Sequence, residues 1–139
     1  MNSPGRVLLI EDSESDVLAM RRYFARHGLT DCLDVAFDGE AAIRRLSAAK
    51  QPTLVLVDLN LPKIRGAEVI QWIRCQPALD RTRVCILSTA PPDQDRRSAD
   101  ERKEDEYWTK PDSLEEFDAL MDRILTLLNQ SAAAKRDDD

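Results

Sequence analysis

The chain has few cysteines and histidines, the residues that build zinc sites and disulfide frameworks. Its 139 residues include three cysteines and one histidine. Cys32, Cys75 and Cys85 are odd in number and lie far apart, which excludes a zinc site made of closely spaced ligand pairs. We expect reduced thiols, with Cys32 and Cys85 buried in apolar runs and Cys75 exposed.

Long apolar stretches and dense basic clusters are also missing. The opening residues MNSPGR lead into an apolar run of only four residues, which is too short for a signal peptide or a membrane span. The 26 acidic residues outnumber the 20 basic ones, and no basic cluster could grip a nucleic-acid backbone. The sequence predicts a soluble, cytoplasmic protein that binds neither membranes nor nucleic acid.

Short apolar runs alternate with helical patterns along the chain. Residues 7–10, 53–57 and 84–87 are compact and rich in branched side chains, which predicts strands buried on both faces, and weaker strand signals lie at 33–37 and 106–109. A helix is expected after Ser15, another after Asp38-Gly39, and a third between Gly66 and Pro77. Such an order predicts an α/β fold with a parallel sheet that helices cover on both faces.

One domain accounts for a chain of this length. We expect it to span residues 6–130, after an N-terminal extension of residues 1–5. Its last helix follows Ser113, which with Glu116 makes a capping box, and residues 131–139 are expected to form a disordered tail.

Polar residues stand where the predicted strands end. Glu11 and Asp12 follow the first strand, Asp58 the third, Ser88 the fourth and Lys110 the fifth. Ligands bind at the carboxyl ends of strands in sheets of this kind, so we expect these side chains to meet at one edge.

Three converging carboxylates favour a divalent cation, and Mg²⁺ suits their hard oxygen atoms. An aspartate such as Asp58 can then attack phosphorus, provided that the metal and a cation such as Lys110 neutralise the transferring group. The Ser88 hydroxyl would donate a hydrogen bond to that group. Taken singly, these residues could equally be solvated loop acids, a surface lysine and a hydroxyl bonded to local backbone. Their combination favours phosphoryl chemistry.

Four short motifs carry a resemblance to the receiver domains of response regulators: EDS (11–13), DLNLP (58–62), LST (87–89) and KP (110–111). The resemblance covers about Arg6 to Asn129. It implies a flavodoxin-like (βα)5 fold with strand order 2-1-3-4-5. It also implies that Asp58 accepts a phosphoryl group from a histidine kinase, so that the protein catalyses only its own phosphorylation and dephosphorylation and is not otherwise an enzyme.

The same resemblance assigns individual roles. Mg²⁺, which Mn²⁺ or Ca²⁺ would replace, is expected on Glu11, Asp12, Asp58 and the backbone carbonyl of Asn60. Ser88 and Tyr107 form the implied switch: Ser88 moves toward the phosphoryl group, Tyr107 turns into the vacated space, and the face of helix four, strand five and helix five changes. Tyr107 could instead be a fixed core aromatic, with Trp108 on the opposite side of the strand. The bond between Lys110 and Pro111 is expected to be cis.

Two segments depart from the family pattern. The stretch from Asp93 to Glu106 is unusually charged, which predicts a helix four that is short or mobile, although an ordinary solvated helix is the alternative. The Pro91-Pro92 pair should stiffen the loop that moves with Ser88.

The segment from Asp58 to Arg74 most resembles stand-alone regulators that are paired with bacterial phytochrome kinases. In that group, homodimers often form through helix four, strand five and helix five. A motility-type or phosphorelay intermediary is an alternative on the same fold. A hydrolase that forms a phosphoaspartate is another alternative, but the short strand-end loops leave no length for its substrate pocket.

Overall fold

The structure is a computed structural model, which describes residues 5–48, 51–59, 61, 64–89 and 106–137, and the side chains as far as residue 129. Five parallel strands form one sheet in the order β2-β1-β3-β4-β5. They are β1 (Val7–Ile10), β2 (Leu33–Ala36), β3 (Leu54–Asp58), β4 (Arg83–Ser88) and β5 (Glu106–Thr109). The predicted flavodoxin-like fold is confirmed, including the two strands whose sequence signals were weak.

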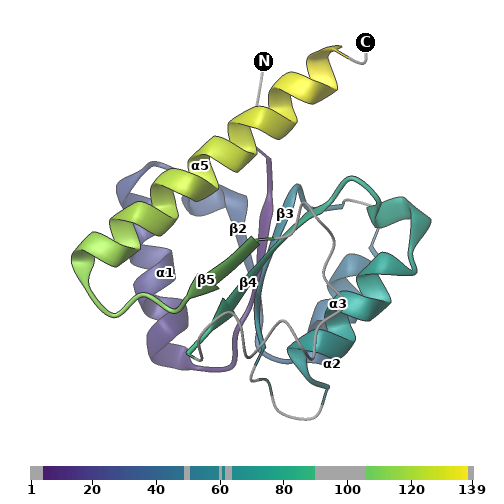
Figure 1. Ribbon diagram of the computed structural model, residues 1–139, viewed down its shortest axis with the longest axis horizontal. Coiled ribbons are helices and arrows are strands. Elements are labelled where there is room, and N and C mark those ends of the chain that lie inside the picture. The colour runs from purple at the N-terminus through teal and green to yellow at the C-terminus, as the bar shows by residue number, and fades with distance from the viewer. Residues whose placement is uncertain (1–4, 49–50, 60, 62–63, 90–105, 138–139) are drawn as a thin grey trace.

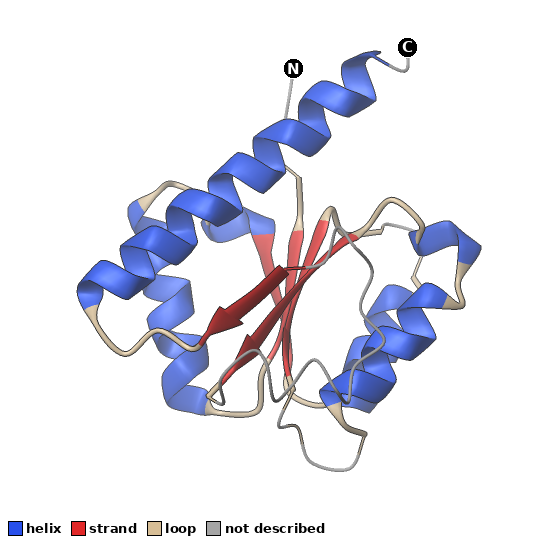
Figure 2. Cartoon of the chain, in the orientation of Figure 1, coloured by secondary structure: helices blue, strands red, loops and turns tan. Residues whose placement is uncertain are grey.

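Helices cover both faces of this sheet. α1 (Glu14–Arg26) and α5 (Leu114–Asp137) pack on one face, and α2 (Gly39–Leu46) and α3 (Gly66–Arg74) pack on the other (Figure 1). Short 3-10 turns at Thr30–Cys32 and Pro77–Leu79 precede β2 and β4. The strands run in the same direction, so their carboxyl ends lie along one side of the sheet, called the carboxyl edge below. The loops to the following helices begin there (Figure 2).

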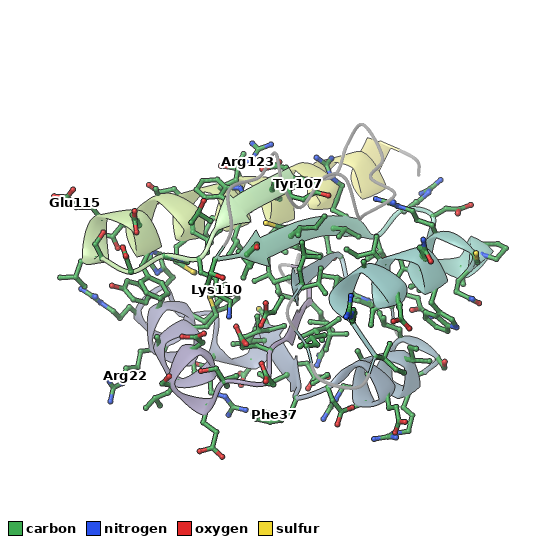
Figure 3. All side chains as sticks on the ribbon, turned by 60° about the horizontal axis from the view of Figure 1, so that its bottom comes forward. Arg22, Phe37, Tyr107, Lys110, Glu115 and Arg123 are labelled. Carbon is green, nitrogen blue, oxygen red and sulfur yellow. The ribbon has the colours of Figure 1, made fainter. Side chains whose placement is uncertain are left out.

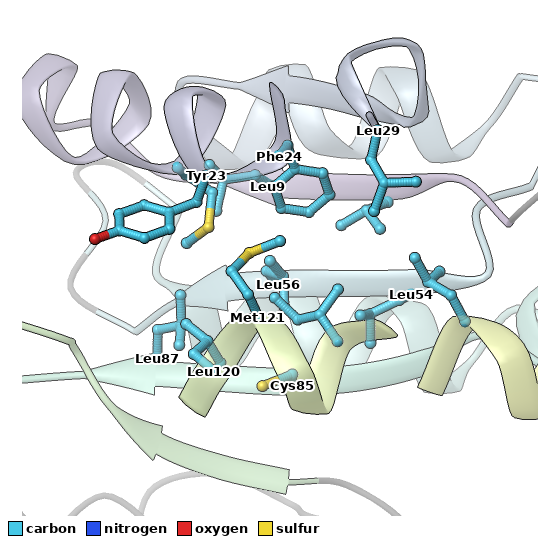
Figure 4. Close-up of a cluster of buried hydrophobic side chains, with 14 of the residues drawn as sticks. Leu9, Tyr23, Phe24, Leu29, Leu54, Leu56, Cys85, Leu87, Leu120 and Met121 are labelled. Carbon is cyan, nitrogen blue, oxygen red and sulfur yellow. The ribbon is translucent and has the colours of Figure 1, made fainter. Parts of the chain in front are cut away.

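The core therefore has two layers, one on each side of the sheet. Under α1 and α5, the layer contains Leu9, Phe24, Leu56, Leu120 and Met121, among others (Figure 4). Under α2 and α3, it contains residues such as Val57, Ile70 and Ile86. Alternate residues of β1 and β3 point into opposite layers, which explains why these strands are apolar throughout.

The helix ends agree with the sequence signals in most details. Ser13, and not Ser15, caps α1, because its Oγ accepts a hydrogen bond from the Asp16 amide at 3.3 Å. At α5, the Ser113 hydroxyl accepts from the Glu116 amide at 3.2 Å. The Glu116 carboxylate bonds back to the amide of Asp112 at 2.9 Å, one residue before the expected position.

The C-terminal end of α5 differs from the expected one. The helix continues to Asp137, through residues that the sequence places in a disordered tail, and its last turns extend past the sheet in Figure 1. Residues 132–134 are alanines, which have the highest helix propensity, and no proline or glycine follows them.

The cysteines and the predicted lack of a membrane span can be compared directly with the structure. Cys85 is buried and Cys75 is exposed, as predicted, whereas Cys32 is only partly buried. Among the described residues, no helix combines the length and apolar character that a bilayer span requires. The predictions for the charged stretch from Asp93 and for Pro91-Pro92 fall outside the described residues.

Two leucines of α5 provide a test of the layer beneath it. Leu120→Ala should destabilise the protein by about 3 kcal/mol, because Leu120 is completely buried and its loss leaves a cavity. Leu114→Ala should cost less than about 0.5 kcal/mol, because Leu114 is 68% exposed. Urea unfolding measures both values. Equal losses would contradict the packing of α5 on the sheet.

Candidate functional site

Three acids meet at the carboxyl edge of the sheet. Glu11 and Asp12 follow β1, and Asp58 is the last residue of β3. One carboxylate oxygen from each residue lies within 4.8 Å of those of the other two. Glu11 and Asp58 are buried at 2% exposure each, whereas Asp12 is exposed to solvent. The convergence expected from strand ends is thus present.

The backbone around Asp58 is held closely on both sides. Asp58 lies beside Leu87 of β4 in the parallel register, and the amide of Leu59 donates to the Leu87 carbonyl at 3.2 Å. On the other side, α3 starts so near β3 that a Cβ on Gly66 would lie 2.3 Å from the Asp58 carbonyl oxygen. Only glycine permits this approach, so Gly66 helps to fix where Asp58 ends the strand.

Lys110 reaches the acids from the end of β5. Its Nζ lies 2.8 Å from Glu11 Oε1, 3.1 Å from Asp58 Oδ2 and 3.1 Å from Asp16 Oδ2. Its backbone amide donates to the Ser88 carbonyl at 2.8 Å, which ties the end of β5 to the end of β4. Figure 3 shows Lys110 in the region between β5 and α1.

Asp16 is the site residue that sequence reasoning missed. In the sequence it follows Ser13 by three positions, so it looks like an acid in the first turn of a helix. Its contact with Lys110 joins residues that are 94 positions apart, and only the folded chain reveals such a contact.

Burial and charge act in opposite directions on this group of residues. Burial, followed by a hydrogen bond to Asp58, raises the pKa of Glu11 from 4.5 to about 7, although Lys110 counteracts part of the shift. For Lys110, burial alone would lower the pKa, but hydrogen bonds to Glu11, Asp16 and Asp58 hold it above its ordinary value. The ammonium group therefore stays charged while the carboxylates compete for it.

Ser88 and Tyr107 lie close to this edge. Ser88 ends β4 and is buried at 3% exposure. Tyr107 pairs with Ile86, which stands two residues before Ser88 and so shares its face of the sheet. Tyr107 packs against the layer under α2 and α3, and Trp108 packs against the layer under α1 and α5. The prediction that the two aromatics occupy opposite sides is confirmed.

One predicted detail of the site is wrong, and another lies outside the described residues. The peptide bond between Lys110 and Pro111 is trans, so the expected cis bond is wrong. Trans is the more stable form even before proline, by about 0.5–1 kcal/mol. Asn60, whose carbonyl was expected to bind the metal, falls outside the described residues.

The donor set of the acidic cluster fits a hard divalent cation. Glu11, Asp12 and Asp58 offer carboxylate oxygens, which Mg²⁺ and Mn²⁺ both accept. The exposure of Asp12 leaves one side of the cluster open to water, and Mg²⁺ usually retains several water ligands. These residues are therefore suited to hold the metal that the sequence predicts.

Comparison with known proteins shows the family. Residues 7–122 match the response regulator receiver domain, and the chain belongs to this family. It is 32% identical over 126 residues to a probable methanogenesis regulatory protein, FilR2, of Methanothrix harundinacea, covering 87% of this chain and 81% of that protein. It is 31% identical over 129 residues to response regulator Rcp1 of Synechocystis, covering 88% of each.

Solved structures agree with this assignment. The phosphorylated cyanobacterial phytochrome response regulator RcpA superposes with a TM-score of 0.77 at 27% identity, over 91% of this chain and 94% of that one. A Mn²⁺-bound form of response regulator Rcp1 superposes with a TM-score of 0.70 at 30% identity, over 87% of this chain and 91% of that one. The chain thus resembles phytochrome response regulators in sequence and in fold.

The raised pKa of Glu11 predicts a pH-dependent effect of its replacement. Between about pH 5 and pH 7, the folded protein keeps a proton on Glu11 that the unfolded chain has lost, so this residue makes stability fall as pH rises. Glu11→Gln removes that slope. In buffer without divalent cations, its stability relative to the wild type should increase by about 2 kcal/mol across this range.

Urea unfolding at several pH values measures this effect. The exposed Glu14→Gln variant serves as the control for the loss of one carboxylate outside the buried cluster. Parallel pH profiles for Glu11→Gln and the wild type would show that Glu11 keeps an ordinary pKa in the folded protein.

Proposed function

We propose that this protein is a single-domain response regulator that accepts a phosphoryl group on Asp58 from a histidine kinase, in a Mg²⁺-dependent reaction. The observation that carries the proposal is the placement of Asp58. It is buried at the end of β3, next to Glu11 and Asp12, and its Oδ2 lies 3.1 Å from the Lys110 ammonium.

This arrangement supports a direct displacement at phosphorus. A carboxylate oxygen of Asp58 attacks the phosphorus atom, and the donor's leaving group departs with the electron pair. Lys110 neutralises negative charge on the transferring oxygens, and the Ser88 hydroxyl donates a hydrogen bond to one of them. When bound by Glu11, Asp12, Asp58 and the Asn60 carbonyl, Mg²⁺ supplies further positive charge.

The signal then spreads from β4 to β5 as a shift between two populated states. Ser88 moves toward the new phosphoryl group, and Tyr107 turns into the space beside it. The shared face of Ser88 and Tyr107 supports this coupling, because Tyr107 lies next to Ile86 in the same row of the sheet. The surface of β5 and α5 carries the change to a partner.

Apolar side chains near the site suggest where the kinase binds. Leu18, Phe37 and Leu114 are 50%, 46% and 68% exposed. They lie one turn into α1, directly after β2 and at the start of α5, in segments that leave the carboxyl edge of the sheet. An exposed apolar residue on a segment that leaves this edge can contact a partner whose phosphohistidine must reach Asp58.

The kinase that we propose is of the phytochrome type. The support is the likeness to phytochrome response regulators, which extends over about nine-tenths of the chain. A homodimer through helix four, β5 and α5 stays a further prediction. In the described part of that face, Glu106 bonds to both Arg123 and the Trp108 indole, so Trp108 already has a partner within the chain.

Mass spectrometry tests the phosphoacceptor. Incubation with Mg²⁺ and acetyl phosphate should add about 80 Da, the mass of one phosphoryl group, to the wild type. Asp58→Asn should abolish the adduct, because the amide is not a comparable nucleophile. Asp118→Asn, at an exposed position on α5, should behave like the wild type. An adduct that persists in Asp58→Asn would refute the assignment.

One substitution can separate kinase docking from the phosphoryl-transfer reaction at Asp58. Leu18→Gln should slow phosphotransfer from a phytochrome-type histidine kinase by about tenfold, a loss typical of an interface contact. It should leave the rate with acetyl phosphate unchanged, because Leu18 is not part of the acidic site.

Ala78→Gln provides the control, since Ala78 is exposed in the turn before β4, at the opposite edge of the sheet.

A panel of other histidine kinases tests the pathway. Faster transfer from a chemotaxis-type kinase than from every phytochrome-type one would contradict the proposed partner.

A further inference from the structure

Asp16 contacts Lys110 although it lies outside the three-acid cluster. Its Oδ2 accepts a hydrogen bond from Lys110 Nζ at 3.1 Å, the same distance that separates Nζ from Asp58 Oδ2. Asp16 belongs to the first turn of α1, whereas Lys110 follows β5. The contact therefore links α1 to the opposite half of the sheet.

A role in capping α1 does not explain why the Asp16 carboxylate points toward Lys110. An acid three residues after a capping serine commonly bonds back to the amide of that serine. Here the Ser13 amide donates to Glu11 Oε2 at 3.3 Å, and the Asp16 carboxylate reaches Lys110. The helix dipole favours acids in the first turn, but it would be satisfied equally by Glu14, which is exposed on the same turn.

The three carboxylates around Lys110 differ in whether they also belong to the acidic cluster. An ammonium group has three N–H donors, and here it has three carboxylate partners, Glu11, Asp16 and Asp58. Glu11 and Asp58 also belong to the cluster that is suited to a divalent cation, so their oxygens are shared. Asp16 is not a member of that cluster, and its contact with Lys110 does not compete with the metal.

We propose that Asp16 is a positioning residue, whose carboxylate holds the Lys110 ammonium beside Asp58 during phosphoryl transfer. This inference rests on the proposed function. A lysine side chain is flexible, and its ammonium is a point charge without a fixed direction. A carboxylate on the rigid first turn of α1 keeps that charge at the place where negative charge develops.

With acetyl phosphate as donor, the step balances without a proton. An Asp58 oxygen forms the new bond to phosphorus, the bond from phosphorus to the acetate oxygen breaks, and acetate leaves with the electron pair. Lys110 turns one N–H toward a phosphoryl oxygen and keeps another on Asp16. Without Asp16, the ammonium would no longer be held from the α1 side.

The test compares Asp16→Ala and Asp16→Asn with Glu14→Gln, a control that removes one negative charge from the same helical turn. Phosphorylation by acetyl phosphate is followed at saturating Mg²⁺, and Mg²⁺ affinity is titrated separately. Asp16→Ala should lower the maximal rate constant by about tenfold, a loss typical of a misplaced catalytic group. Its Mg²⁺ affinity should change by less than about threefold.

Asp16→Asn keeps an oxygen acceptor at the same place, so its rate should lie between those of the wild type and Asp16→Ala. Glu14→Gln should match the wild type. A readout without metal or phosphodonor is the lysine ammonium signal in NMR spectra. Lys110 should exchange faster in Asp16→Ala than in the wild type, because two of its three carboxylate partners remain.

Several results would overturn the proposal. These are an Asp16→Ala rate equal to or above that of the wild type, equal losses for the Asn and Ala variants, or a fall in Mg²⁺ affinity that parallels the fall in rate. If instead the wild type gains no phosphoryl group on Asp58, the proposed function fails, and the NMR comparison still decides whether Asp16 holds Lys110.

Discussion

The site depends on one cation among several acids. Lys110 places its ammonium within 3.1 Å of Glu11, Asp16 and Asp58, and two of these acids are buried. Burying like charges together is unfavourable unless a counter-charge is present. The ammonium supplies one positive charge for three carboxylates, so it offsets only part of their negative charge. A site with unbalanced negative charge is a site prepared for a divalent cation.

The sheet determines which groups can share this cation. β1, β3, β4 and β5 are parallel neighbours, so their carboxyl ends lie side by side. Glu11, Asp58, Ser88 and Lys110 each stand at or just after one of these ends. The two apolar layers hold the strands in register, so stability is provided by the core, away from the reactive edge. This separation allows charged groups to be crowded at one edge without loss of the fold.

In the proposed function, the same edge brings phosphoryl transfer, signalling and partner recognition together. Asp58 and Lys110 are suited to phosphoryl transfer, and Ser88 lies in the row of the sheet that leads to Tyr107. Leu18 and Leu114 expose apolar surface on the helices that flank the reactive groups. A partner that docks on α1 would also touch the helix that carries Asp16. Under both proposals, contact with the partner and the position of Lys110 would be connected through α1.

The sequence alone determined the fold class, the strand order implied by the family resemblance, and the acids, hydroxyl and lysine at the strand ends. These features follow from local patterns: short branched runs, helical spacing, and polar residues directly after strands. The tertiary structure decided what local patterns cannot encode. The bond of Asp16 to Lys110 and the close approach of Gly66 to Asp58 both depend on how separate elements pack. Residues far apart in the chain become neighbours only when the whole sheet has formed.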